Sequence, residues 1–88
     1  MAAPASSIER LECTPRYSEA VLHQGLVYLS GQVPEHTLDG SAAEQTADVL
    51  SLIDAHLARA GSSRARILSA TIYLVDLRRD YADMNSVW

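Results

Sequence analysis

The sequence predicts a small α+β domain in which helices cover one face of a mixed β-sheet. Three observations support this prediction. Two β-rich runs flank Gly25, apolar residues recur with a helical period from 43 to 60, and the period changes to two at residues 67–75. The expected element order is therefore β-β-β-α-β-α, within a single domain spanning residues 1–88.

The N-terminal third of the chain is expected to form a disordered tail and three strands. Residues 1–7 are small and mostly polar, and chain ends of this kind are usually poorly ordered. A short strand is predicted from Ile8 to Leu11. The runs Tyr17–His23 and Leu26–Leu29 should pair as an antiparallel hairpin, with the three residues 23–25 in a bulged turn.

The middle of the chain carries the signals of a helix of about four to five turns. Ser41 and Glu44 have the spacing of a capping box, in which each side chain accepts a hydrogen bond from the other residue's backbone N–H. Apolar residues then recur every three or four positions: Ala43, Ala47, Leu50, Ile53, Leu57 and Ala60. Gly61 stands where a glycine commonly ends a helix.

The segment 67–75 is predicted to be a fourth strand. One face is apolar throughout: Leu68, Ala70, Ile72 and Leu74. The other face is mixed: Ile67, Ser69, Thr71, Tyr73 and Val75. A strand, a crossover helix and a strand imply a parallel pair with a right-handed connection. Asp80 is then expected to cap a second helix that begins at Tyr81 and continues to the last residue, Trp88.

The mixed sheet face has no obvious cover within a chain of 88 residues. Burial of apolar surface contributes roughly 25 cal/mol for each Å² removed from water. We therefore expect the chain to oligomerise through its sheet, and clefts between subunits are the natural places for ligands.

Composition and charge disfavour several classes of function. The net charge is −4 and the seven basic residues are scattered arginines, which disfavours binding to nucleic acid. A single cysteine, Cys13, allows no intrachain disulfide and no thiolate metal cluster. The sequence shows no signal-peptide pattern and no membrane-spanning run, so a cytoplasmic location is expected. His23, His36 and His56 lack metal-site spacing, and His56 is expected to face solvent.

The run Ser30-Gly31-Gln32-Val33-Pro34 resembles the Ser-Gly-Gln-apolar-Pro signature of the RidA (YjgF, L-PSP endoribonuclease-like) family. Other runs resemble the same family and occur in its order: Tyr17–Val21, Gln45-Thr46, Ala60-Gly61, Ala70–Leu77 and Met84–Trp88. The resemblance covers nearly all of the chain after residue 16.

This resemblance implies a chorismate-mutase-like fold, assembled as a homotrimer with ligand sites in the clefts between subunits. Deaminase members of the family add water to the C=N carbon of 2-imino acids or their enamine tautomers. They release ammonia and a 2-oxo acid, and they use neither a metal nor an organic cofactor. The implied ligand is therefore a small 2-imino or 2-oxo acid.

The resemblance also implies four ligand-binding residues. The phenol of Tyr17 can orient the substrate or a water molecule, and Ser30 helps to shape the pocket. The backbone N–H of Gly31 approaches a bound carboxylate, which a Cβ would hinder. Asn85 lies on the second helix near the same cleft.

The chain also departs from the family pattern. The family has an arginine in a Pro-x-Arg segment that grips the substrate carboxylate, and a glutamate on the last strand that positions or activates water. Both follow the second helix, so we expect this domain to be incomplete at its C-terminus and assign no catalytic residue. Leu52 replaces the usual helix asparagine, the loop 35–40 is short, and residues 78–80 contain an insertion. These features suggest a divergent branch.

Three functions are therefore under consideration. The leading hypothesis is a hydrolytic deaminase of reactive imines. The alternative is a non-catalytic trimer that binds small carboxylates through Tyr17 and Gly31. An endoribonuclease is the third hypothesis, disfavoured by the acidic charge and by the lack of a catalytic histidine pair.

Overall fold

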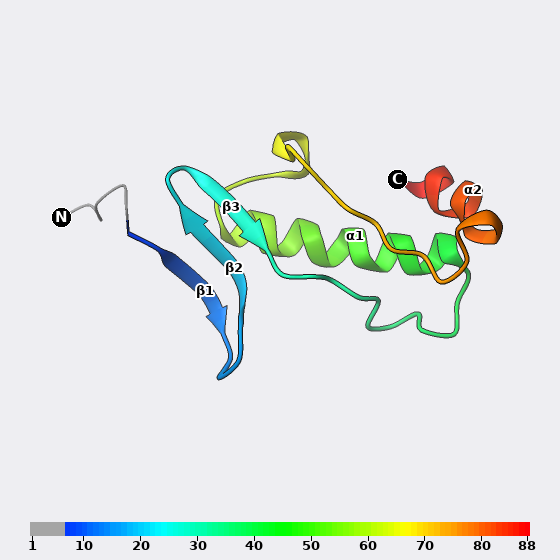
Figure 1. Cartoon of the computed structure of the whole chain (residues 1–88), viewed down its shortest axis with the longest axis horizontal. Helices are drawn as coiled ribbons and strands as arrows, with labels where there is room; N and C mark the ends of the chain where they lie inside the picture. The colour runs from blue at the N-terminus through cyan, green and yellow to red at the C-terminus, as the bar shows by residue number, and fades with distance from the viewer. Residues whose placement is uncertain (1–6) are drawn as a thin grey trace.

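The computed structural model describes residues 7–88 and has an α+β architecture (Figure 1). Three antiparallel strands lie in the order β1-β2-β3: Glu9–Cys13, Ser18–His23 and Leu26–Leu29. Two helices and a short 3₁₀ turn follow: α1 (Ala42–Arg59), η1 (Arg64–Arg66) and α2 (Leu77–Val87). The predicted α+β class is confirmed, and the first three strands occur close to where the sequence predicts them.

Strands β2 and β3 are joined by a tighter turn than predicted. His23 pairs with Leu26, so the connection contains only Gln24 and Gly25. Their φ angles are 51° and 78°, and two consecutive positive values are typical of a type I′ turn. This turn matches the right-handed twist of the flanking strands, which explains why a two-residue connection replaces the predicted bulge.

The expected tail at residues 1–7 lies outside the described residues, except for Ser7. The carbonyl oxygen of Ser7 is 3.0 Å from Nδ1 of His23. The chain is therefore already in contact with the sheet two residues before β1 begins.

Helix α1 begins and ends as predicted. The Ser41 hydroxyl accepts a hydrogen bond from the Glu44 N–H at 3.1 Å, and the Glu44 carboxylate accepts one from the Ser41 N–H at 3.2 Å. At the other end Gly61 has a φ of 79°, and the Ser62 N–H donates to the Leu57 carbonyl at 2.8 Å. A capping box and a Schellman motif thus satisfy backbone groups that the helix itself leaves unpaired.

The predicted fourth strand is not formed, and the predicted parallel pair is wrong for the described chain. Residues 67–75 carry no strand, and the sheet of residues 7–88 is antiparallel throughout. A groove of about 2470 Å³, lined by β3, α1 and residues 67–75, separates this segment from β3. Without a neighbouring strand to pair with, its side chains stay open to solvent: Leu68 is 85% exposed and Tyr73 91%.

Helix α2 begins at Leu77 rather than at the predicted Tyr81. Its N-cap is Asp76, whose carboxylate accepts a hydrogen bond from the Arg79 N–H at 3.2 Å. The predicted cap, Asp80, lies inside the first turn, where a negative charge is favoured by the unpaired N–H groups of the helix start. Either aspartate could have capped a helix start, and the sequence alone did not show which of them is the N-cap.

The buried core of the described chain is small. Four hydrophobic residues are nearly inaccessible: Ala20, Leu50, Leu57 and Met84. Helix α1 packs against β3 and against α2, which lies along its N-terminal half (Figure 1). The molecule is consequently elongated, at 50 × 28 × 18 Å. Within residues 7–88, neither helix is long and apolar enough to cross a membrane.

The N-terminal cap of α1 provides a direct test of this fold. Replacing Ser41 with Ala removes the acceptor for the Glu44 N–H, so the free energy of unfolding should fall by about 1 kcal/mol. Ser51→Ala, at an exposed position inside the same helix, is the matched control and should be neutral or slightly stabilising. Urea denaturation followed by far-ultraviolet circular dichroism measures both. Equal effects at the two positions would contradict the cap.

Candidate functional site

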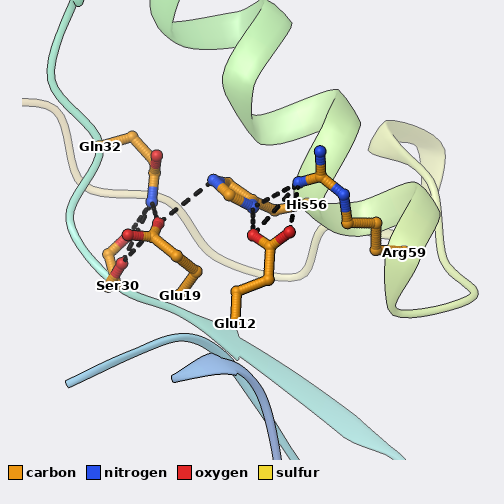
Figure 2. Close-up of polar contacts among 6 residues, drawn as sticks. All are labelled: Glu12, Glu19, Ser30, Gln32, His56 and Arg59. Carbon is orange, nitrogen blue, oxygen red and sulfur yellow. Dashed lines mark hydrogen bonds and ion pairs between the residues drawn. The ribbon is translucent and has the colours of Figure 1, made fainter. Parts of the chain in front are cut away.

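A cluster of polar side chains joins the sheet to the C-terminal half of α1 (Figure 2). Its members come from β1, from β2, from the segment after β3 and from α1: Glu12, Glu19, Ser30, Gln32, His56 and Arg59. We call this group the Glu19 cluster, because the carboxylate of Glu19 contacts side chains from two of the other segments.

The Glu19 carboxylate accepts hydrogen bonds from several donors on one of its oxygens. The amide nitrogen of Gln32 lies 3.0 Å from Oε2, and the hydroxyl oxygen of Ser30 lies 3.4 Å from it. Gln32 also donates to the Ser30 hydroxyl and to its carbonyl, each at 3.1 Å. The Ser30 N–H in turn donates to the backbone carbonyl of Glu19 at 3.0 Å, which continues the ladder between β2 and β3. Strand pairing therefore fixes these three side chains beside one another.

These contacts favour the charged form of Glu19. The hydrogen bond from Gln32 is the largest influence that lowers the pKa of this carboxyl, and partial burial opposes it. Interactions with Tyr17, His56 and Ser30 lower the pKa further. Glu19 is consequently an anion at neutral pH.

His56 lies between two carboxylates, as Figure 2 shows. Its Nε2 is 3.2 Å from Glu19 Oε2, and its Nδ1 is 3.2 Å from Glu12 Oε2. Both nitrogens can donate at once only when the imidazole is protonated. The side chain is 11% exposed, so the prediction that His56 faces solvent is wrong. His56 directly precedes Leu57 and follows Ile53 by three residues. It therefore lies at the edge of the apolar stripe of α1, close enough for side chains of the strands to contact it.

Glu12 completes the cluster from an unusual backbone conformation. Its φ is 50°, which is uncommon for a residue with a side chain and is found mainly at positions held by their surroundings. Its neighbours Leu11 and Cys13 pair with Ala20 and Ser18 of β2, and the Glu12 carboxylate contacts His56 as that of Glu19 does. Arg59 Nη1 is 3.0 Å from Glu12 Oε1. Arg59 of α1 thus pairs with Glu12, and His56 of the same helix contacts both carboxylates.

Three of the four residues predicted to bind a ligand lie on neighbouring chain segments, Tyr17 directly before β2 and Ser30 and Gly31 directly after β3. Tyr17 precedes Glu19 by two residues, and interaction with the Glu19 carboxylate is the main cause that raises the pKa of the Tyr17 phenol. Ser30 bonds to the same carboxylate, and Gly31 lies between Ser30 and Gln32. A Cβ added at Gly31 would meet no atom within 4 Å, so the space over this residue is open.

Asn85, the fourth predicted residue, lies elsewhere in the chain. Helix α2 contacts the start of α1, where the Asp83 carboxylate accepts a hydrogen bond from the Ala43 N–H at 3.0 Å. His56 comes thirteen residues after Ala43, which corresponds to roughly 20 Å along a helix. A single chain therefore does not place Asn85 beside Tyr17.

Sequence reasoning missed Glu19, Gln32 and His56 as parts of the site. A weak signal was available for two of them, because Glu19 follows Tyr17 by two strand positions and Gln32 follows Ser30 by two. Residues with this spacing share a face when the backbone is extended. No comparable signal exists for His56, which meets the strands only after the chain folds. Across residues 7–88, no group of three or more His, Cys, Asp or Glu side chains is placed to hold a metal ion.

Comparison with known proteins identifies the family. The model of the family described as Endoribonuclease L-PSP matches residues 7–88. The chain belongs to the YjgF/RutC/L-PSP (RidA) family. The predicted resemblance is thus confirmed, including the segment that carries Tyr17, Ser30 and Gly31.

Individual members of the YjgF/RutC/L-PSP family share much of this sequence. A RutC family protein of Haemophilus influenzae is 46% identical over 82 residues, which cover 93% of this chain and 70% of the relative. The RutC family protein YoaB of Escherichia coli is 45% identical over 82 residues, covering 93% of this chain and 69% of YoaB.

A solved structure of the same family agrees with the fold. The crystal structure of NMB1025, a YjgF family member from Neisseria meningitidis, superposes with a TM-score of 0.90 at 54% identity. The superposition covers 97% of this chain and 69% of NMB1025. This chain therefore spans about 70% of the length of these family members.

The charge of Glu19 predicts a pH dependence of stability. A carboxyl whose pKa is lowered by folding stabilises the fold above its unfolded pKa, and this contribution is lost as the pH falls through the folded value. In Glu19→Gln the loss of stability below about pH 4.5, the ordinary pKa of glutamate, should be smaller than in the parent chain. Glu9→Gln, an exposed position on β1, is the control and should match the parent. Urea titrations from pH 3 to 7 measure this, and identical profiles for all three proteins would contradict the role of Glu19.

Proposed function

We propose that this protein is a hydrolytic deaminase of reactive 2-imino acids and their enamine tautomers. The reaction would release ammonia and a 2-oxo acid in clefts between the subunits of a homotrimer. The observation that carries the proposal is that pairing of β2 with β3 places Ser30, and with it Gly31, beside Glu19, two residues after Tyr17. Membership of the YjgF/RutC/L-PSP family supports it, because the resemblance to that family implies ligand-binding roles for these three residues.

The arrangement suits a small, polar substrate. The open space over Gly31 leaves room for a substrate carboxylate to approach the backbone N–H. Tyr17 is 54% exposed, and its raised pKa keeps the phenol protonated at neutral pH. A protonated phenol can both donate a hydrogen bond and accept one from a water molecule or from an imine N–H.

The chemical step is the addition of water across C=N. The water oxygen bonds to the imine carbon, the π electrons move to nitrogen, and the resulting carbinolamine loses ammonia to give the 2-oxo acid. In this scheme Tyr17 orients the water or the imine, and Gly31 holds the carboxylate. No residue of this chain is assigned as the base that removes the proton of the attacking water.

The proposal includes a homotrimer, because part of the apolar surface of the sheet is exposed to solvent in a single chain. Along β3, Val27 and Leu29 are half-buried, whereas Leu26 and Tyr28 are 42% and 54% exposed. Neighbouring copies would bury this exposed apolar face. Since Asn85 lies far from Tyr17 within one chain, a cleft that uses both residues must take them from two subunits.

The first experiment measures the reaction itself. A 2-imino acid is generated from an amino acid by an amino-acid oxidase, and its conversion to the 2-oxo acid is followed with and without the protein. Tyr17→Phe should lower kcat/KM about 10–100-fold, because it removes the group that orients the water. Tyr73→Phe, at an exposed tyrosine outside the Glu19 cluster, should keep the parental rate.

The outcomes of this assay are distinct. A folded, trimeric protein that does not accelerate hydrolysis at enzyme concentrations equal to the imine would exclude the deaminase. If that protein nevertheless binds 2-oxo acids in calorimetry and loses binding in Tyr17→Phe, the function is instead non-catalytic binding of small carboxylates.

The second experiment tests the shared cleft by subunit mixing. Tyr17→Phe and Asn85→Ala should each be impaired alone. If the two residues act from different subunits, refolding the variants together should restore part of the activity, because some clefts then combine two intact residues. Sedimentation equilibrium should give three times the chain mass. A stable, folded monomer at micromolar concentration would rule out this arrangement.

A further inference from the structure

The side chain of Gln32 folds back toward Ser30, two residues earlier in the chain. Its amide nitrogen lies 3.1 Å from the Ser30 carbonyl oxygen and 3.1 Å from the Ser30 hydroxyl oxygen. The same nitrogen lies 3.0 Å from Oε2 of Glu19, so a carboxylate of β2 holds the amide in place (Figure 2). A carbonyl and a carboxylate accept hydrogen bonds and cannot donate them, so only the NH₂ end of the Gln32 amide fits this position.

The bond to the Ser30 carbonyl fixes the orientation of one peptide unit. This carbonyl and the N–H of Gly31 belong to the same planar unit, and no cis peptide bond occurs in residues 7–88. In a trans unit the C=O and the N–H point in opposite directions. The Gly31 N–H therefore points away from the Gln32 amide.

The Gly31 N–H is an unpaired donor on a segment that is held in place. Within residues 7–88, no hydrogen bond joins this N–H to another group. Gly31 is exposed, and a Cβ built on it meets no atom within 4 Å. The preceding N–H, that of Ser30, donates to the Glu19 carbonyl at 3.0 Å. A backbone donor whose orientation is set before a ligand arrives is suited to binding an anion, because little ordering is left to be done on binding.

We propose that Gln32 is a positioning residue, whose amide fixes the Ser30–Gly31 peptide unit and thereby directs the Gly31 N–H toward the ligand carboxylate. The inference rests on the proposed function, in which Gly31 holds that carboxylate, and adds the side chain that orients it.

Ser30 and His56 support this arrangement from two sides of the network. The Ser30 hydroxyl donates to Glu19 at 3.4 Å and accepts from Gln32, so its single proton is committed within the cluster. The ligand carboxylate is thus left to the backbone N–H. His56 Nε2 lies 3.2 Å from Glu19 Oε2, the oxygen that also accepts from Gln32. Helix α1 therefore restrains the carboxylate that holds the amide.

Backbone dynamics of Gly31 test the inference without a ligand. In the parent chain the ¹⁵N order parameter of Gly31 should be about 0.85, the value of rigid backbone, and in Gln32→Leu it should fall below about 0.6. Gln45→Leu is the matched control, because the Gln45 amide also donates to a backbone carbonyl, that of Gly40 at 2.9 Å, and its loss should leave Gly31 ordered. A mobile Gly31 in the parent chain, or an unchanged order parameter in folded Gln32→Leu, overturns the inference.

Pyruvate, a small 2-oxo acid, tests where the N–H points. Titration of the ¹⁵N-labelled parent chain should move the Gly31 amide resonance. In Gln32→Leu the Kd for pyruvate should rise about 10-fold, because a hydrogen bond to a charged group is weakened, and in Gln45→Leu it should stay at the parental value. The inference is wrong if the Gly31 resonance moves at no pyruvate concentration, or if folded Gln32→Leu binds pyruvate as tightly as the parent.

An exchange of two side chains separates orientation from stability. Gln32→Glu places two carboxylates together and should lower the free energy of unfolding. Adding Glu19→Gln restores an amide–carboxylate pair, so the free energy of unfolding should recover. Gly31 should nevertheless stay mobile, because a carboxylate at position 32 cannot donate to the Ser30 carbonyl. Recovery of both stability and Gly31 order would show that Gln32 acts only through its pairing with Glu19, contrary to the inference.

The failure of this inference is distinguishable from the failure of the proposed function. Imine hydrolysis by a protein whose Gly31 does not respond to Gln32→Leu would keep the deaminase and remove the positioning role. Pyruvate binding at Gly31 that depends on Gln32, without any imine hydrolysis, would remove the deaminase and keep the positioning role.

Discussion

The packing of α1 across the strands is the constraint on which the described structure depends. The core contains few buried residues, and two of them, Leu50 and Leu57, belong to this helix. Polar contacts from the last turns of α1 to β1 and β2 fix the helix against the sheet, and α2 lies along its N-terminal half. If α1 shifted, the Glu19 carboxylate would lose its contact with His56, and α2 would lose the helix against which it packs. Fold and site therefore share one interface.

Local chemistry made most of the fold predictable from the sequence. The capping box at Ser41 and the left-handed Gly61 each involve residues a few positions apart, and the helix between them follows from the spacing of its apolar side chains. The segment 67–75 shows the limit of such reasoning. Its period-two pattern indicates an extended backbone, but a strand also needs a hydrogen-bonding neighbour, and the sequence pattern does not reveal which neighbour lies alongside.

The site was predictable only in part, for a similar reason. Tyr17, Ser30 and Gly31 were found through a short motif and its order in the chain. Glu19 and His56 were not, since their importance comes from a contact between residues 37 positions apart. An isolated histidine on a helix looks like a surface residue until the strands that face it are known. Composition and periodicity do not show which polar side chains from distant parts of the sequence come into contact in the folded chain.

The type I′ turn at Gln24-Gly25 has a consequence for the order in which the structure assembles. Its strands are adjacent in sequence, so little loop entropy opposes their pairing, and hairpins of this kind form in about 1–10 μs. The contact between Glu12 and Arg59 must instead close a loop of 47 residues. Glu19 should thus be presented on a finished hairpin before His56 reaches it.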